Sequence, residues 1–284
     1  MHKFLLALTL LLAANAAAVN ETATSIATPA IDHSKYNSNL VTAHRGSSSS
    51  APENTLSSIR RAIEDGAGYA ELDVQETSDG IPILMHDISA KRTTGIDKPV
   101  WQISYNELQQ ASAGAWFHQQ FENERVPTLE QVIETASDRI KLNIELKNNG
   151  HQQRLAEATV ELLEKHHFEK NCTVTSFDKA LLRKVKQQNP NIKTGLIADK
   201  KPSSAASLEE FMSSPDYDVI SAAYPMVDQQ FVSSASAHHK QVYVWTVNDP
   251  KLMETMRDLN VDSIITNQPE QLIQLLSQKP KQSL

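Results

Sequence analysis

Glycine is scarce in this sequence, and its few glycines match neither of two common nucleotide-binding loops. Only 8 of the 284 residues are glycine, about 3% against a usual ~7%. A Walker loop needs two glycines five positions apart followed by lysine and serine or threonine, and a dinucleotide fingerprint needs three glycines. Gly66 and Gly68 begin the second pattern, but Glu71 stands where its third glycine belongs. The sequence therefore excludes both kinds of phosphate-binding loop.

Basic residues and cysteine are also in short supply. There are 27 Lys and Arg against 34 Asp and Glu, so the formal net charge is −7. This balance argues against a nucleic-acid partner, because phosphate contacts need a basic face. The single cysteine allows no internal disulfide. With 40% hydrophobic residues, the chain is a folded protein of one large domain or two small ones.

The N-terminus carries a short apolar run. Residues 1–3 are a basic segment, residues 4–14 are apolar apart from one threonine, and small residues up to Ala18 resemble a signal-peptidase site. We expect a secretory signal peptide at 1–18, a polar leader at 19–38 and the folded domain at 39–284, which makes the protein secreted or periplasmic. A membrane anchor ranks second, because the run is shorter than the ~20 residues of a membrane-spanning helix; an ordinary buried helix is the third alternative.

From residue 39 onward, nine short β-rich runs alternate with amphipathic helical segments. This alternation is typical of parallel β/α units, and it predicts one α/β domain, a (β/α)8 TIM barrel. A doubly wound open sheet is the alternative. The nine runs are 40–43, 69–74, 81–85, 141–146, 172–176, 193–197, 217–221, 241–246 and 263–266.

The run at 81–85 is one strand more than a barrel needs. Only residues 75–80 separate it from the strand before, and so short a connection makes an antiparallel hairpin rather than a parallel neighbour. The residues that follow have little strand or helix pattern. We expect them to form a short insertion, about 87–127, over the active-site mouth. It holds the aromatic residues Trp101, Trp116, Phe117 and Phe121.

Capping residues mark several helix boundaries. Gly66 predicts the C-terminal end of the first helix. The patterns Thr128-x-x-Gln131 and Ser207-x-x-Glu210 predict capping boxes at two helix starts.

Ionisable residues gather at the predicted C-terminal ends of the strands, where the working face of a β/α barrel lies. Glu71 and Asp73 are two positions apart and therefore share one face of a strand that is otherwise apolar. The strand at 141–146 repeats this arrangement, and the first strand and the hairpin each end in a histidine. The residues concerned are His44, Arg45, Glu71, Asp73, His86, Asp87, Asn143, Glu145 and Lys147.

Three of these residues, Glu71, Asp73 and Glu145, would place carboxylates inside the barrel. Burying them is unfavourable unless positive charge compensates, and a hard divalent cation with oxygen ligands is the simplest compensation. A structural salt bridge to Arg45 or Lys147 is the stronger explanation for any one carboxylate; for the three together we favour a metal. Zinc is disfavoured, because the group is all oxygen and the histidines have no recognisable zinc spacing.

His44 and His86 end strands beside these carboxylates, as expected of a general acid and a general base. Arg45 and Lys147 next to a cation would form an anion site. A phosphoryl group fits such a site best.

Further short motifs follow one another in a fixed order between about residues 40 and 275. They are His44-Arg45-Gly46, Pro52-Glu53-Asn54-Thr55, Glu71-Leu72-Asp73-Val74, Asp79-Gly80, His86-Asp87, Arg92-Thr93-Thr94-Gly95, Gly114-x-Trp116-Phe117, and the segments 126–130, 143–147, 244–248 and 264–267. In order and spacing this set resembles the glycerophosphodiester phosphodiesterases, a family of PI-PLC-like phosphodiesterase barrels. Each motif alone is weak evidence, but the ordered set is highly specific.

The resemblance implies a barrel enzyme that hydrolyses glycerophosphodiesters to glycerol 3-phosphate and an alcohol with a bound divalent metal, Ca²⁺ or Mg²⁺. It implies that Glu71, Asp73 and Glu145 are the metal ligands. It also implies that His44 and His86 are the catalytic acid and base.

The resemblance further implies five substrate-binding residues. Arg45 and Lys147 would bind phosphate, and Glu53 and Asn54 would brace the first loop or approach the metal through water. Trp245 would line the glycerol or alcohol pocket, with plain barrel core as an equal alternative. The family's large helical insertion is absent or short here.

Three other functions stay open at this stage. A lysophospholipase D or sphingomyelinase D-like enzyme acting on long-chain lipids would share the metal and both histidines. A glycosidase would use Glu71 with Glu145 and leave Arg45 and Lys147 unexplained. A non-catalytic sugar-phosphate binding barrel would have no need of two acid–base histidines. The nucleophile, water or the glycerol 2-hydroxyl, is open too, as is the oligomeric state; the sequence indicates no stable protein partner.

Overall fold

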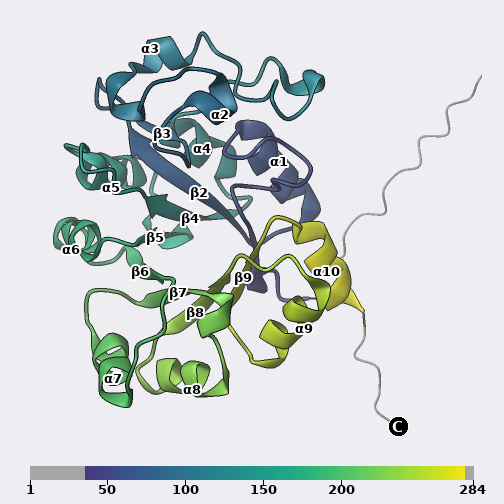
Figure 1. Cartoon of the computed structure of the whole chain (residues 1–284), viewed down its shortest axis with the longest axis vertical. Helices are drawn as coiled ribbons and strands as arrows, with labels where there is room; N and C mark the ends of the chain where they lie inside the picture. Colours follow the sequence, from purple (N-terminus) through teal and green to yellow (C-terminus); the bar gives the residue numbers. More distant parts are fainter. Residues whose placement is uncertain (1–35, 279–284) are drawn as a thin grey trace, which may run out of the picture. The chain divides into compact units, whose positions relative to one another are not determined.

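The computed structural model describes residues 36–278, in which eight parallel strands close into a barrel (Figure 1). Strand β1 pairs with β2 on one side and with β9 on the other, which closes the sheet. The predicted TIM barrel is therefore confirmed, and the open doubly wound sheet is wrong. The barrel strands are β1 (Val41–Ala43), β2 (Tyr69–Glu76), β4 (Lys141–Leu146), β5 (Cys172–Ser176), β6 (Lys193–Ala198), β7 (Val219–Ala223), β8 (Gln241–Trp245) and β9 (Ser263–Thr266).

The predicted signal peptide at 1–18 and residues 19–35 of the predicted leader lie outside the described residues. The last leader residues are described, and Tyr36 donates a hydrogen bond from its hydroxyl to the Gly66 carbonyl at 2.8 Å. Within residues 36–278, no helix combines the length and the apolar character that crossing a membrane requires.

Helices pack around the outside of the barrel (Figure 1). Strand side chains alternate between the two faces of a sheet, so Leu72, Ile144 and Val174 point outward and join the helices in the main hydrophobic core. Within the described residues, the helices that follow barrel strands are α1 (Leu56–Asp65), α4 (Leu129–Ala136), α5 (Leu155–Lys165), α6 (Lys179–Gln188), α7 (Ala205–Ser213), α8 (Gln229–Ala237), α9 (Pro250–Asp258) and α10 (Pro269–Ser277).

Side chains fill the N-terminal end of the barrel interior. The rings of Tyr69 and Tyr243 lie 6.2 Å apart between their centroids, and Tyr243 packs with Val219 in a buried cluster. The hydroxyls of Thr42 and Ser263 share a hydrogen bond of 2.6 Å across the β1–β9 pair. Because this end is filled, the inward-facing residues near the carboxyl ends of the strands are the ones that can meet a ligand.

Two of the three predicted helix boundaries are confirmed. Gly66 ends α1 with a left-handed φ of 87°, which glycine adopts without strain, and Thr128 forms its capping box with Gln131. The predicted start at Ser207 is wrong, because α7 is capped one turn earlier by Ser204. The two serines cap each other reciprocally, since the backbone N–H of each donates to the hydroxyl of the other.

One further strand, β3 (Pro82–Leu84), lies outside the barrel and pairs antiparallel with β2, as the short connection predicts. The insertion that follows contains α2 (Lys91–Thr94) and α3 (Tyr105–Leu108) and has a small hydrophobic core of its own with β3. The four aromatic residues expected in it are half-buried or exposed, so they do not form that core.

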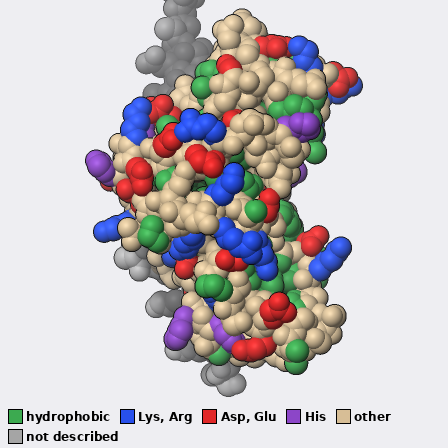
Figure 2. Space-filling model, turned by 90° about the vertical axis from the view of Figure 1, so that its left-hand side faces the viewer, with side chains coloured by type: hydrophobic (Ala, Val, Ile, Leu, Met, Phe, Trp, Pro, Cys, Tyr) green, Lys and Arg blue, Asp and Glu red, His purple; other side chains and the backbone are tan. Residues whose placement is uncertain are grey.

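Charged side chains of both signs are interspersed over the face shown in Figure 2, which is the left-hand side of Figure 1, where α5 and α6 lie. Helix α6 contributes ion pairs of this kind: Arg183 with Asp216 at 2.9 Å and Lys186 with Asp218 at 2.7 Å. Exposed pairs stabilise a fold only slightly. This face is therefore a mixed, well-solvated surface.

Candidate active site

The candidate active site lies at the carboxyl ends of β1, β2 and β4. In the β2–β4 pair, Glu71 stands opposite Asn143 and Asp73 opposite Glu145. The alternation of side chains turns all three carboxylates into the barrel, where their oxygens lie within 4.8 Å of one another. The structure thus brings together the three acidic residues that the sequence singled out.

Burial and mutual repulsion make this carboxylate cluster electrostatically unusual. Burial, followed by the charges of Asp73 and Glu145, raises the pKa of Glu71 well above its usual range. Burial and Asp73 likewise raise the pKa of Glu145 to about 7. Asp73 differs: burial alone would raise its pKa, but the nearby charges of Lys147 and Arg45 lower it.

The two predicted phosphate-binding cations compensate this cluster only in part. Nζ of Lys147 lies 2.9 Å from Glu145 and 3.3 Å from Asp73, and Nε of Arg45 lies 3.4 Å from Asp73. Among the described residues, no lysine or arginine side chain lies within ion-pair distance of Glu71, which accepts a hydrogen bond from the backbone N–H of Arg45 at 2.9 Å. Surplus negative charge and an all-oxygen donor set fit a hard cation such as Ca²⁺ or Mg²⁺.

His44 follows β1 and is held by a hydrogen bond that it donates to Asn267, the residue after the neighbouring strand β9. Its Nδ1 lies 2.6 Å from Oδ1 of Asn267, which also accepts from Ser48. An amide oxygen accepts hydrogen bonds, so Nδ1 carries the proton and Nε2, 3.8 Å from Glu71, has the lone pair. Burial, followed by the charge of Arg45, lowers the pKa of His44 to about 4.

His86 reaches the site on the segment that returns from β3. Its Nδ1 lies 2.8 Å from Oδ1 of Asp87, which fixes the orientation of the ring. Gln75 holds the same segment by donating to the backbone carbonyls of Met85 at 2.9 Å and Asp87 at 2.7 Å. His86 and His44 both line the cavity that contains the carboxylates.

Glu53 and Asn54 lie in the loop after His44 and outside the lining of that cavity. Asn54 adopts a left-handed φ of 55°, which asparagine tolerates better than most residues. Its amide donates to Asp73 at 2.8 Å and accepts from the Asp73 backbone N–H at 3.1 Å. Glu53 accepts a hydrogen bond from Arg45 at 2.9 Å. Both residues therefore support a residue of the site, Asp73 or Arg45, without lining the cavity themselves.

The same cavity also has an apolar wall. Trp245, at the end of β8, donates from its indole to the Ser221 carbonyl at 2.9 Å. Its ring meets Phe177 edge to face with centroids 6.0 Å apart. Ile197 and Ile265 complete this wall, and the cavity volume is about 160 Å³. A space of this size suits a small organic group.

Several residues of the site were not assigned a role from the sequence. Arg92 and Asn267 belong to the quoted motifs, but the motifs do not say what these side chains contact. Gln75 is two positions after Asp73 on the same strand, so the alternation that identifies Glu71 and Asp73 as inward-facing also predicts that Gln75 faces inward. Phe177 is a single apolar residue after a strand, which no pattern distinguishes from core.

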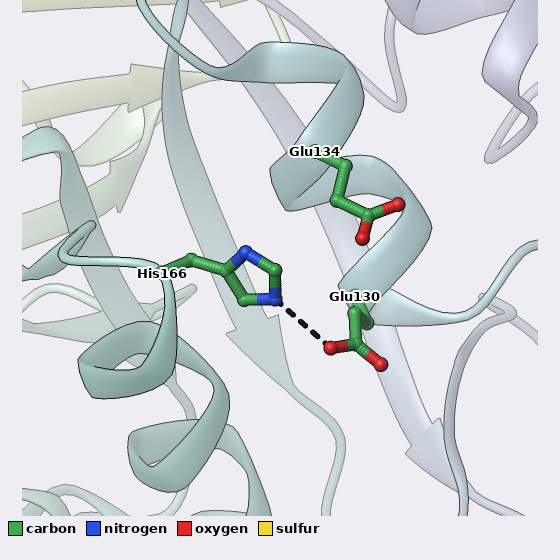
Figure 3. Close-up of side chains that lie close together, drawn as sticks. All are labelled: Glu130, Glu134 and His166. Atoms are coloured by element: carbon green, nitrogen blue, oxygen red, sulfur yellow. Dashed lines mark hydrogen bonds and ion pairs between the residues drawn. The ribbon is translucent and has the colours of Figure 1, made fainter.

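A second group of acidic and histidine side chains lies on the outer helices. Figure 3 shows Glu130 and Glu134 on α4 facing His166 at the end of α5. Glu130 accepts from His166 at 2.9 Å and from Lys165 at 2.6 Å, and these hydrogen bonds lower its pKa. Because a lysine and a histidine already donate hydrogen bonds to Glu130 at the surface, the group is a polar connection between two helices.

Comparison with known proteins yields one family. Residues 44–271 match the model of the Glycerophosphoryl diester phosphodiesterase family. The chain is 34% identical over 247 residues to a glycerophosphodiester phosphodiesterase from Caldanaerobacter subterraneus subsp. tengcongensis, an alignment that covers 84% of this chain and 97% of that relative.

Solved structures agree with this match. One is a phosphodiesterase from Oleispira antarctica in complex with the product sn-glycerol-3-phosphate, with a TM-score of 0.78, 31% identity and coverage of 87% of this chain and 99% of that one. Another is a glycerophosphodiester phosphodiesterase from Thermotoga maritima, with a TM-score of 0.69, 28% identity and coverage of 83% and 97%.

Proposed function

Since the chain belongs to the glycerophosphoryl diester phosphodiesterase family of enzymes, we propose that it hydrolyses glycerophosphodiesters to sn-glycerol 3-phosphate and an alcohol. The observation that carries the proposal is one cavity lined by two histidines, two buried carboxylates and one half-buried one, an arginine and a lysine. Hydrolysis of a phosphodiester needs compensation of the charge on the phosphoryl oxygens and proton transfer at the attacking and departing oxygens. These groups can supply both.

We propose that Glu71, Asp73 and Glu145 hold a divalent cation, Ca²⁺ or Mg²⁺. The closeness of their oxygens, the raised pKa values of both glutamates and, among residues 36–278, the lack of a lysine or arginine paired with Glu71 support this assignment. When bound, such a cation supplies Lewis-acid stabilisation of the charge on the phosphoryl oxygens.

Arg45 and Lys147 bind the phosphate in this scheme. Nε of Arg45 is buried and lies 3.4 Å from Asp73, but it makes no hydrogen bond among the described residues, so it can still donate to a phosphate oxygen in the cavity that Arg45 lines. Such a buried donor is unfavourable unless an acceptor arrives. Trp245 and its apolar neighbours line the space for the glycerol carbons, and the small volume of that space favours glycerol over a bulkier group.

We assign the general base to His44 and the general acid to His86. The nucleophile, a water molecule or the glycerol 2-hydroxyl, gives its proton to Nε2 of His44 as its oxygen bonds to phosphorus. The bond from phosphorus to the alcohol oxygen breaks, and that oxygen receives a proton from Nε2 of His86. If the glycerol hydroxyl attacks, the product is a cyclic phosphate that water then opens. The hydrogen bonds that Nδ1 of each ring donates support the assignment, because they leave each Nε2 for the reaction.

The test is the release of sn-glycerol 3-phosphate by the purified protein from glycerophosphocholine, glycerophosphoethanolamine and glycerophosphoglycerol. We expect release that a chelator abolishes and that Ca²⁺ or Mg²⁺ restores. Cleavage of long-chain lysophospholipids without cleavage of these esters would identify a lysophospholipase D-like enzyme instead. Binding of the esters without product would identify a binding barrel, and chelator-resistant cleavage of glycosides a glycosidase.

We also propose that the protein acts outside the cytoplasm, with residues 1–18 as a cleaved signal peptide. The basic start, the apolar run and the small residues before position 19 support this proposal. Cell fractionation and N-terminal sequencing test it: we expect a secreted or periplasmic chain that begins at Val19. An intact N-terminus in the membrane fraction would show an anchor.

A further inference from the structure

Arg92, on α2 of the insertion, lies between two carboxylates and binds both of them in bidentate fashion. Its Nε and Nη2 donate to the two oxygens of Asp87 at 2.6 and 3.1 Å. Its Nη1 and Nη2 donate to the two oxygens of Glu53 at 2.9 and 2.7 Å. A planar guanidinium can hold two carboxylates in a fixed relative position, which a lysine ammonium cannot do.

Each of these carboxylates also contacts a residue of the proposed active site. Asp87 accepts from Nδ1 of His86 at 2.8 Å, and Glu53 accepts from Nη1 of Arg45 at 2.9 Å. The hydrogen bonds from Arg92 hold the pKa of Asp87 far below its usual range, so Asp87 is an acceptor. It therefore keeps the proton of His86 on Nδ1.

A second residue of the insertion, Trp116, packs against Arg92. The guanidinium carbon lies 5.7 Å from the centre of the Trp116 ring, in cation–π contact. Trp116 is 42% exposed, so this contact explains why a large aromatic residue stays at the surface. Arg92 makes four hydrogen bonds and contacts the face of one aromatic ring. These contacts restrict its side chain to few conformations.

From this geometry we propose that Arg92 is a positioning residue that acts on His86 through Asp87, with Glu53 and Trp116 holding Arg92 in place. This inference rests on the proposed function, in which His86 protonates the departing alcohol. Without Arg92, Asp87 is free to rotate, and the imidazole loses its fixed tautomer and direction. Proton donation to the alcohol then becomes slow, whereas phosphate binding by Arg45 and Lys147 stays intact.

The experiment compares two esters of sn-glycerol 3-phosphate in the metal-loaded enzyme. Choline needs a proton as it leaves, whereas 4-nitrophenolate leaves as a stable anion and does not. We expect Arg92→Gln to lower kcat for glycerophosphocholine by ~10- to 100-fold and kcat for the 4-nitrophenyl ester by less than about 3-fold, with little change in KM. A merely structural role would lower both rates alike.

Two further variants make the result specific. Arg125→Gln is the matched control, because Arg125 lies in the same insertion and donates to the backbone carbonyls of Glu122 and Glu124; we expect both rates to stay near wild type. The double variant Asp87→Ala with Arg92→Gln should be no slower than Asp87→Ala alone, because Arg92 acts on His86 only through Asp87.

Equal losses for both esters, no loss for either, or multiplicative losses in the double variant would overturn the assignment of Arg92 alone. A wild-type chain that cleaves neither ester would overturn the proposed function and this inference with it.

Discussion

Replacement of Glu145 by glutamine distinguishes a metal ligand from a structural partner of Lys147. The side chain of Glu145 is 12% exposed near the end of β4 and lies 2.9 Å from the lysine ammonium, and both roles fit that contact. The variant Glu145→Gln keeps the shape of the side chain and removes its charge. The two roles predict opposite effects on stability at high pH.

The magnitude follows from the raised pKa of Glu145. Burial and Asp73 raise this pKa from 4.5 to about 7, so the folded chain binds this proton more tightly than the unfolded chain. Between those pH values the folded state holds more protons, and its free energy of unfolding falls as the pH rises. At about 1.4 kcal/mol per pH unit, the ionised carboxylate destabilises the metal-free fold by about 3 kcal/mol at pH 8.

His44 contributes a pH dependence of the opposite sign. Burial lowers its pKa from 6.5 to about 4, so stability falls as the pH drops through that range. This contribution is common to the wild type and the variant. The difference in stability between the two proteins at each pH therefore isolates Glu145.

The assay is denaturation by urea at pH 5 and pH 8, first in chelator and then in excess Ca²⁺ or Mg²⁺. In chelator we expect the variant to be more stable by about 1 kcal/mol at pH 5 and by about 3 kcal/mol at pH 8. A cation at 100 times its Kd stabilises the wild type by about 2.7 kcal/mol, and we expect little gain in the variant. Glu134→Gln, a change at an exposed acid on α4, is the control and should follow the wild type.

One result would refute this reasoning. If the wild type is the more stable protein at pH 8 in chelator, and neither cation changes the difference, then Glu145 is the ion-pair partner of Lys147 and not a metal ligand.

Three further predictions concern the catalytic and supporting residues. Either His44→Ala or His86→Ala should lower kcat by ~10²- to 10⁴-fold with little change in KM; near-normal turnover would exclude the two-histidine scheme. Arg45→Lys should raise the Kd for sn-glycerol 3-phosphate by roughly 10-fold, measured by calorimetry, because lysine lacks the planar fork; an unchanged Kd would remove Arg45 from the phosphate site. Asn54→Ala should lower the free energy of unfolding by about 2 kcal/mol, since Asp73 loses a partner and alanine is strained at positive φ; an unchanged denaturation midpoint would contradict this.

Most of the barrel could be predicted because its signals are local. The period of two in strands and the turn residues between segments identify all nine strands, and the short connection before Ile81 identifies the antiparallel one. The boundary errors occur where local signals compete. At α7, Ser204 and Ser207 are both competent caps, and the helix begins after the earlier one.

The strand-end residues of the site could be predicted for the same reason, since a residue's place on a barrel strand determines where its side chain points. Asn267 and Arg92 could not, because Asn267 lies in the loop after β9 and Arg92 on a four-residue helix of the insertion, where no strand period predicts which side chains they contact. Asn267 lies 223 positions from His44 in the sequence. A period or a spacing cannot report contacts over such separations.

The position of β3 has a consequence for how this enzyme and its relatives diverge. In the barrel, β2 pairs directly with β4, and β3 is not part of the closed sheet. The hairpin strand and the insertion are therefore attached beside the barrel and have a separate small core. Changes in the length of this segment leave the hydrogen bonds of the barrel and its three carboxylates untouched. The same segment carries His86, Asp87 and Arg92. The segment that carries half of the proposed acid–base pair can therefore change in length as one unit, provided that it keeps its contacts to Gln75 and Glu53 in the rest of the chain.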